Sequence, residues 1–308
     1  MTESSPSSGQ LRYDTVTLLS DMGTVDGFVG VVHSVIRQMA PGVGVVDLSH
    51  GVAPFDVRGG SLTLARSVQY LCPGVIVGLV DPGAGGPQRP IALEVAGGAA
   101  VLIGPDNGLL APAVGMIGGA ERAVVLDDPT YHLPTSATTF AGRDVFAPVA
   151  AHLCNGIALT DLGTEVDPAT LMPGLVPLTS VEHDGDGVPV LSAEVLWVDH
   201  FGNAQLNVDP DEIDGWGDRL HVRVGSTVRT AARVRAFAEL GTGEIGVLVD
   251  ADGLVALVAD RHAAADELGI TTGDAVTLTP LGDEGTPVGT RTAVTIGRRS
   301  DDDKESPT

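Results

Sequence analysis

A short apolar run that ends in an aspartate constrains the fold of this chain most strongly. The run, 75–79, reads Val-Ile-Val-Gly-Leu and is followed by Val80, Asp81, Pro82 and several glycines. An uninterrupted apolar run of this length is typical of a parallel strand buried on both faces. Pro82 has no N–H for the ladder and therefore ends the strand. A carboxylate placed there lies at the carboxyl edge of an α/β sheet, where ligands bind. This segment alone fits equally well an aspartate that only caps its own turn.

The segments before this run alternate between predicted strands and predicted helices. Strands are expected at 15–20, 43–48 and 75–79, and a helix that Asp26 could cap carries apolar residues from Phe28 to Met39. A second helix begins at 54–56. This alternation indicates a parallel sheet with crossover helices. Further strands are expected at 91–95, 100–103 and 122–126, and a late helix follows 140–144.

The pattern changes after Pro177. The acidic, glycine-containing stretch 181–188 is typical of a linker or an exposed hairpin. Short apolar runs with frequent turns follow it and predict a small barrel or sandwich. These runs are 193–198, 204–208, 220–224, 245–249, 254–258, 275–278 and 292–296.

We therefore predict two domains. An α/β nucleoside-binding domain with a largely parallel sheet is expected at 13–178, a linker at 179–190 and an all-β barrel-like domain at 191–298. The polar residues 1–12 and the acidic residues 299–308 are expected to be disordered tails.

Composition excludes several classes of partner. The chain has 17 Lys and Arg against 40 Asp and Glu, a net charge of −23 that repels nucleic acid and anionic membranes. No apolar run approaches the ~20 residues of a membrane-spanning helix, and the polar N-terminal residues do not resemble a signal peptide. Cys72 and Cys154 are predicted to be buried free thiols in helical contexts, which favours a reducing compartment and a cytoplasmic protein.

Four polar turns are the candidates for chemistry. The turns at 21–24 and 81–86 follow strands of one parallel sheet, so we expect them to cluster at its carboxyl edge. Carboxylates there suit a ribose diol, because each oxygen accepts a hydroxyl proton. The other two turns are 104–108 and 199–203. The sequence lacks the glycine fingerprints of dinucleotide and triphosphate sites, which argues against those substrates.

The histidine and serine patterns carry less information about function than the polar turns do. No His, Cys and Asp spacing is typical of zinc, so we predict no metal, and no nucleophile elbow indicates a serine hydrolase. His33 and His152 lie on predicted helices and are expected to be packed or surface residues, whereas His50 and His132 lie in loops. The residues alone indicate a small-molecule α/β enzyme with a nucleoside-like site.

Taken together, these turns resemble those of the S-adenosylmethionine (SAM) hydroxide adenosyltransferases, also called SAM hydrolases, which are related to the bacterial fluorinase and chlorinase. The resemblance covers residues 15–297. Its motifs, in the family's order, are Ser20-Asp21-Met22-Gly23-Thr24, Val46-Asp47-Leu48-Ser49-His50, Pro54-Phe55-Asp56, Val80-Asp81-Pro82-Gly83, Gly104-Pro105-Asp106-Asn107-Gly108-Leu109-Leu110, Thr139-Phe140-Ala141-Gly142-Arg143-Asp144 and Asp199-His200-Phe201-Gly202-Asn203.

The resemblance implies an activity and an assembly. Water would attack the 5′ carbon of SAM, giving adenosine and methionine without a cofactor. The departing sulfonium becomes a neutral thioether, so no general acid is required, and Asp81 is placed to orient or activate the water. Halogenating relatives have a tyrosine at this position. The family forms homotrimers, with each site between one chain's N-terminal domain and a neighbour's C-terminal domain.

The resemblance also assigns the binding residues. In the N-terminal domain, Asp21 would hold the ribose hydroxyls, Phe55 and Phe140 would line the adenosine pocket, and Gly142 stands where the fluorinase has a fluoride-contacting serine. In the C-terminal domain, the residues implied are Asp199, Phe201, Asn203 and the pocket aromatic Phe237.

Two family residues are replaced in this chain. The usual arginine and histidine are here Gln88 and Ala141, so Arg89 or His50 would have to support Asp81, with His132 a further candidate imidazole. These replacements leave open a non-catalytic protein that binds adenosine or SAM. A 5′-halogenating enzyme is a third alternative, which Asp81 disfavours.

Overall fold

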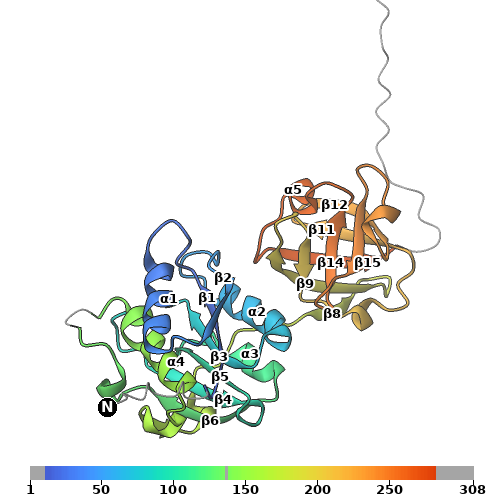
Figure 1. Cartoon of the computed structure of the whole chain (residues 1–308). Helices are drawn as coiled ribbons and strands as arrows, with labels where there is room; N and C mark the ends of the chain where they lie inside the picture. The colour runs from blue at the N-terminus through green and yellow to red at the C-terminus, as the bar shows by residue number, and fades with distance from the viewer. Residues whose placement is uncertain (1–10, 136–137, 282–308) are drawn as a thin grey trace, which may run out of the picture.

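The chain forms two lobes joined by an extended segment (Figure 1). This computed structural model describes residues 11–135 and 138–281. The predicted strand 292–296, the tail 299–308 and most of the tail 1–12 lie outside the described residues.

The N-terminal lobe is built on a seven-stranded sheet in the order β2-β1-β3-β5-β4-β6-β7, counted within the described residues. Strands β2, β1, β3 and β5 are parallel, and β4, β6 and β7 continue the sheet antiparallel. The prediction of an α/β domain with a largely parallel sheet is confirmed. The bounds are β1 Thr15–Ser20, β2 Gly44–Ser49, β3 Gly74–Leu79, β4 Pro90–Val95, β5 Ala100–Pro105, β6 Ala120–Val125 and β7 Thr164–Val166.

Helices cover both faces of this sheet (Figure 1). Helices α1 and α4 pack on one face, and α2 and α3 on the other. Neighbouring strand residues point to opposite faces, so Leu18 and Leu19 are both fully buried but belong to different cores. This burial on two sides explains the continuous apolar runs in the sequence. The bounds are α1 Phe28–Met39, α2 Val57–Ser67, α3 Ala111–Met116 and α4 Ala147–Cys154.

Two local predictions are wrong. Asp26 does not cap α1, because the helix begins one residue later and its N-cap is Gly27. Cys154 is buried at the end of α4 as expected, but Cys72 is exposed. The helix preceding Cys72 ends at Tyr70, so Cys72 is not helical. Pro73, which directly precedes β3, restricts the backbone of Cys72 to extended conformations.

The C-terminal lobe is a closed β-barrel, as predicted. Among the described strands, the order β10-β14-β13-β12-β11-β15-β9 closes into a ring because β10 also pairs with β9. Strand β8 pairs with β9 outside the ring, so the stretch 181–188 belongs to a hairpin. The elements are β8 Ser180–His183, β9 Pro189–Val198, β10 Ala204–Leu206, β11 Arg219–Val224, β12 Thr227–Arg233, β13 Ile245–Val249, β14 Val255–Ala259, α5 Ala264–Leu268 and β15 Ala275–Pro280.

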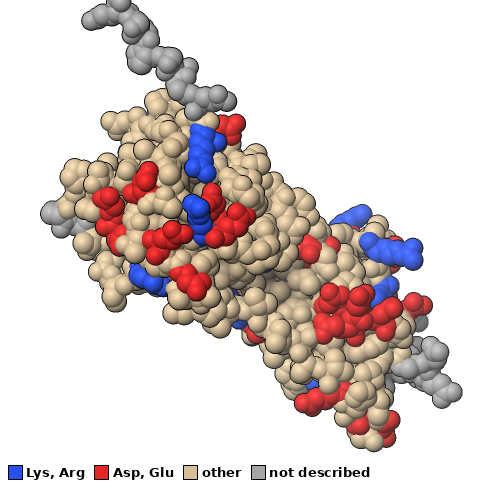
Figure 2. All heavy atoms as spheres, turned by 90° about the horizontal axis from the view of Figure 1, so that it is seen from below, with Lys and Arg blue, Asp and Glu red and all other residues tan. Residues whose placement is uncertain are grey.

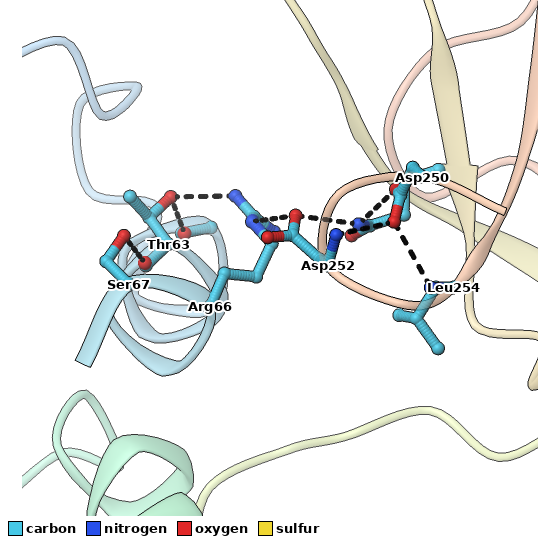
Figure 3. A network of polar contacts seen from close by, with 8 residues as sticks. Thr63, Arg66, Ser67, Asp250, Asp252 and Leu254 are labelled. Carbon is cyan, nitrogen blue, oxygen red and sulfur yellow. Dashed lines mark hydrogen bonds and ion pairs between the residues drawn. The ribbon is translucent and has the colours of Figure 1, made fainter. Parts of the chain in front are cut away.

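Arg66 on α2 connects the two lobes (Figure 3). Its Nε lies 3.7 Å from Oδ2 of Asp252, on the turn between β13 and β14. Its guanidinium also lies 4.3 Å from the centre of the Trp197 ring in β9. A second ion pair joins Arg58 of α2 to Glu194 of β9 at 2.5 Å. Because Arg66 is largely buried, these contacts are screened less than surface ion pairs.

The surface matches the acidic composition. On the face seen in Figure 2, clusters of Asp and Glu lie on both lobes, with fewer Lys and Arg between them. Among the helices that the structure describes, none has the length and apolar character needed to cross a bilayer.

Candidate active site

The register of the parallel sheet places two carboxylates side by side. Ser20, the last residue of β1, pairs with Leu79, the last residue of β3. Asp21 follows the first strand, and Asp81 follows the second after one further residue, Val80. Both line a cavity of about 180 Å³ at this edge of the sheet. The expected clustering of the two turns at the carboxyl edge is therefore present.

Asp81 combines a turn contact with an unusual electrostatic environment. Its Oδ1 accepts a hydrogen bond from the Gly83 N–H at 3.1 Å. Burial raises the pKa of Asp81 above its ordinary value, the Gly83 bond opposes this, and the negative charge of Asp21 raises it further. The carboxylate thus caps its turn with one oxygen and also lines the cavity. A raised pKa makes a carboxylate a stronger base than an ordinary aspartate.

Asp21 fixes the loop that carries Phe55. The Phe55 N–H donates to Oδ2 of Asp21 at 2.8 Å. Phe55 has a φ of 69°, which is rare for a residue with a side chain. Its side chain stays 72% exposed. The hydrogen bond to Asp21 therefore holds the Phe55 backbone in a strained conformation, but Phe55 itself is not among the residues that line the cavity within one chain.

The opposite wall comes from the segment before α4. Phe140 and Gly142 line the cavity, and Phe28 packs edge-to-face on Phe140 with ring centroids 5.1 Å apart. Gly142 is the first residue of a π-helical turn, Gly142–Phe146, a feature frequent at functional sites. A Cβ on Gly142 would lie 3.2 Å from Met22 Cε and from Phe140 Cε2, so a side chain at this position would press against both.

The residues expected to support Asp81 are engaged elsewhere. The Arg89 Nε donates to Asp106 Oδ2 at 3.0 Å, and its Nη2 bonds the same oxygen. Gln88 lies closer to the turn that follows Asp81, because a Cβ on Gly83 would meet the Gln88 Oε1 at 2.5 Å. Ala141 lines the cavity but carries no polar group.

The loop histidines do not line the cavity either. Nδ1 of His50 lies 2.7 Å from Ser20 Oγ, and its Nε2 lies 2.9 Å from Asp47 Oδ1. His33 on α1 reaches the same Asp47 oxygen at 2.7 Å. Burial lowers the pKa of His132, which directly follows the short helical turn Pro129–Tyr131. The fold thus assembles a His33–Asp47–His50 cluster that no sequence spacing indicated.

A second cavity, of about 510 Å³, lies on the barrel. Phe201, Asn203 and Phe237 line it. Asp199 organises the turn that presents the first two: its Oδ1 accepts from the N–H groups of Phe201 and Asn203, both at 2.8 Å. Its Oδ2 accepts from Asn203 Nδ2 at 2.7 Å. Asp199 therefore satisfies its own turn, and Phe201 is left 76% exposed.

Sequence reasoning missed several lining residues, among them Phe28, Arg261 and His262. Phe28 was placed only on the apolar face of α1, although it also lines the α/β cavity. Arg261 and His262 line the barrel cavity just after β14, and Arg261 has a φ of 56°. The polar triplet 260–262, directly after an apolar strand, is the signal that could have identified them. The two cavities share no lining residue within one chain.

Two family models match the chain. The SAM hydroxide adenosyltransferase N-terminal domain matches residues 16–163, and the SAM hydroxide adenosyltransferase C-terminal domain matches residues 193–277. The first contains both carboxylates of the α/β cavity, and the second contains the barrel cavity.

Individual relatives agree with these matches. An (R)-S-adenosyl-L-methionine hydrolase from Salinispora tropica is 42% identical over 264 residues, covering 86% of this chain and 97% of the relative. A fluorinase from Actinoplanes sp. is 25% identical, covering 86% of this chain and 97% of that protein. The crystal structure of an uncharacterized conserved protein from Thermotoga maritima superposes with a TM-score of 0.78 at 29% identity, covering 85% of this chain and 99% of that one.

Proposed function

The chain belongs to the SAM hydroxide adenosyltransferase family, and we propose that it hydrolyses S-adenosyl-L-methionine to adenosine and L-methionine. The observation that carries this proposal is the pair Asp21 and Asp81 lining one cavity at the sheet edge. One carboxylate suits a ribose diol, and the other suits a water molecule beside the 5′ carbon.

The chemical step needs few groups. Water attacks the 5′ carbon of the sugar, the carbon–sulfur bond breaks, and the bonding electrons return to sulfur. Methionine leaves as a neutral thioether, so no acid is needed at the leaving group. The water loses one proton, which Asp81 accepts and passes to solvent. Orienting the water in line with the carbon–sulfur bond supplies much of the remaining acceleration.

Asp81 suits the role of base because of its surroundings. Its raised pKa, caused by burial and then by Asp21, brings its basicity nearer to the operating pH. The reaction consumes only SAM and water, so we propose that the chemical step uses no cofactor.

Adenosine would lie against the aromatic wall. Phe140 lines the cavity with the two carboxylates, Gly142 adds no side chain next to Phe140, and the exposed Phe55 is bound through its backbone to Asp21. A Cβ at position 142 would lie 3.2 Å from Met22 Cε and from Phe140 Cε2, so a serine there would require these side chains to shift by a few tenths of an ångström.

We propose further that the working unit is a homotrimer with each site shared between two chains. The α/β cavity, about 180 Å³, is smaller than the roughly 300–1,000 Å³ of most ligand pockets. Phe28 and Phe55 are exposed on the α/β lobe, and Phe201 and Phe237 on the barrel. Exposed apolar side chains beside incomplete cavities mark association surfaces. We place the protein in the cytoplasm, because both cysteines are free thiols.

The direct test is to incubate the purified full-length protein with SAM and to separate the products by chromatography. Equimolar adenosine and methionine above the spontaneous rate are expected, with no 5′-halogenated product when chloride or fluoride is added. Both sulfonium epimers should be compared, because the Salinispora relative is named for the (R) form. No product despite intact SAM binding would contradict the proposal.

The second candidate function is binding without turnover. It is favoured by the contacts of Arg89 with Asp106 and of His50 with Ser20, which leave Asp81 without the expected support. Calorimetry that detects tight SAM binding, with no adenosine formed over the same period, would establish this alternative.

A further inference from the structure

Two imidazoles and one carboxylate converge outside the cavity that contains Asp81. His33 lies on α1, Asp47 lies in β2, and His50 follows β2 directly. Oδ1 of Asp47 is 2.7 Å from His33 Nε2 and 2.9 Å from His50 Nε2. All three ligand atoms lie within 4.8 Å of one another. The arrangement brings together one oxygen and two nitrogen donors from separate elements.

The ring of His50 is held in place but is not satisfied. The residue is 8% exposed, and its Nδ1 lies 2.7 Å from Ser20 Oγ. Its buried Nε2 lies 2.9 Å from Asp47 Oδ1 but makes no well-aligned hydrogen bond to it. Buried ring nitrogens without a partner are uncommon. When Nδ1 donates to Ser20, Nε2 carries the lone pair, and a cation held between Nε2 and the Asp47 carboxylate would give this nitrogen a partner.

We propose that His33, Asp47 and His50 form a binding site for a divalent transition-metal ion of the zinc class. Two imidazoles and one carboxylate are typical zinc ligands, whereas magnesium and calcium prefer oxygen ligands alone. The Ser20 contact to Nδ1 matches the outer-shell partner that orients a metal-binding histidine.

The cluster can take such an ion with a small adjustment. With bonds of about 2.0–2.2 Å, tetrahedral ligand atoms lie about 3.3 Å apart. The present separations of 2.7 and 2.9 Å would therefore widen by roughly half an ångström. Asp47 and His33 can make this movement, since their side chains are 44% and 26% exposed. The exposure of Asp47 also leaves a fourth position open to water.

Electrostatics favour a cation at this place. The whole chain has a net charge of −23, which raises the local concentration of cations.

The position of the site indicates a structural role. The His50 carbonyl accepts from the Gly23 N–H at 2.9 Å, and the Ser20 hydroxyl accepts from the Met22 N–H at 3.2 Å. A bound ion would therefore tie α1 and the end of β2 to the turn that carries Asp21. It would stabilise that turn without touching the reacting atoms.

The test is metal binding by the full-length, tag-free protein after removal of metal with a chelator. Titration calorimetry with zinc sulfate should give one equivalent per chain. His33→Ala and Asp47→Asn should each weaken binding by at least about 100-fold, and Ser20→Ala by about 10–100-fold as an outer-shell change. His183→Ala, an exposed histidine on β8, is the matched control and should bind normally. Cobalt should give an absorption spectrum typical of tetrahedral coordination.

Absence of stoichiometric zinc binding would overturn the proposal, and so would binding that persists unchanged in both ligand variants. Circular dichroism without metal checks that each variant folds. Should Asp47→Asn fail this check, His33→Gln on the surface of α1 decides the question alone. Binding is measured directly, so the outcome does not depend on whether SAM is hydrolysed.

Discussion

The α/β cavity and the barrel cavity are built from different kinds of side chain. The first contains Asp21 and Asp81 at the ends of neighbouring parallel strands, and burial raises the pKa of Asp81. The second displays Phe201 and Asn203 on a turn in which the Asp199 carboxylate accepts hydrogen bonds from these same two residues. A carboxylate with a raised pKa therefore lies in one lobe, and an exposed aromatic side chain lies in the other. Under the proposed function, the first lobe would carry out the chemical step and the second would contribute to substrate binding.

The largest effect on activity is expected from neutralising Asp81, the carboxylate that distinguishes the α/β cavity from the barrel cavity. Asp81→Asn should lower kcat by about 10²–10⁴-fold, because the base is lost, while KM changes little. Steady-state kinetics with adenosine detection measures both constants. Asp128→Asn is the matched control, since Asp128 caps a comparable turn through the Thr130 N–H at 2.9 Å. Full activity in Asp81→Asn would show that its role is only that of a turn cap.

A second test asks whether the two halves of each active site, the α/β cavity and the barrel cavity, come from different chains. Co-expressed Asp81→Asn and Phe201→Ala/Asn203→Ala chains should form mixed trimers in which some sites have both halves intact. Random assembly leaves about a quarter of the sites unmutated, since each half has an even chance of being intact. Activity measurements on the purified mixture should approach that fraction. No recovery would mean that each chain completes its own site.

A smaller effect on activity is expected from a single substitution in the barrel cavity. Phe201→Ala should raise KM by about 5–150-fold and change kcat less, as expected if the ring stacks on the base and contributes about 1–3 kcal/mol. Phe201→Tyr retains the aromatic face and should restore most of the affinity. A fall in kcat with unchanged KM would assign the barrel a role in the chemical step instead.

The smallest effects come from the titration of Asp81. Protonation of Asp81 removes the base, so kcat/KM should fall as the pH is lowered. Because the pKa of Asp81 is raised, this fall should occur at a higher pH than the pKa of an ordinary aspartate. The folded state binds this proton more tightly than the unfolded state, so protonation of Asp81 favours folding at low pH. That contribution is lost as pH rises through the folded pKa. Asp81→Asn should therefore melt slightly higher than the parent at neutral pH, and equally or lower at pH 3.

The sequence predicted the backbone of the α/β site well. An uninterrupted apolar run located β3, and the β-branched and apolar residues of 15–20 located β1. Parallel strands must place their carboxyl ends together, so the neighbouring positions of Asp21 and Asp81 could be foreseen. The barrel was predicted from short runs, but β12 was missed. Its sequence, TVRTAAR, has few apolar residues because only Ala231 is buried.

Side-chain partners could not be predicted in the same way. Arg89 was expected to be able to turn toward Asp81, yet it pairs with Asp106, 17 residues further along the chain. His50 was considered as a replacement imidazole, yet it is buried between Ser20 and Asp47. These choices depend on rotamers and on contacts between distant segments, which periodicity does not encode.

The exposed strand β2 shows a further consequence of Asp47. Within the described sheet, β2 pairs only with β1, so its other edge presents unpaired N–H and C=O groups. Such an edge can recruit a strand from another molecule, and a charge in its middle opposes this. Asp47 interrupts the run Val45-Val46-Asp47-Leu48, with Val46 45% exposed. The same side chain that faces the two histidines thus stands where a charged residue would oppose pairing between edge strands of different molecules.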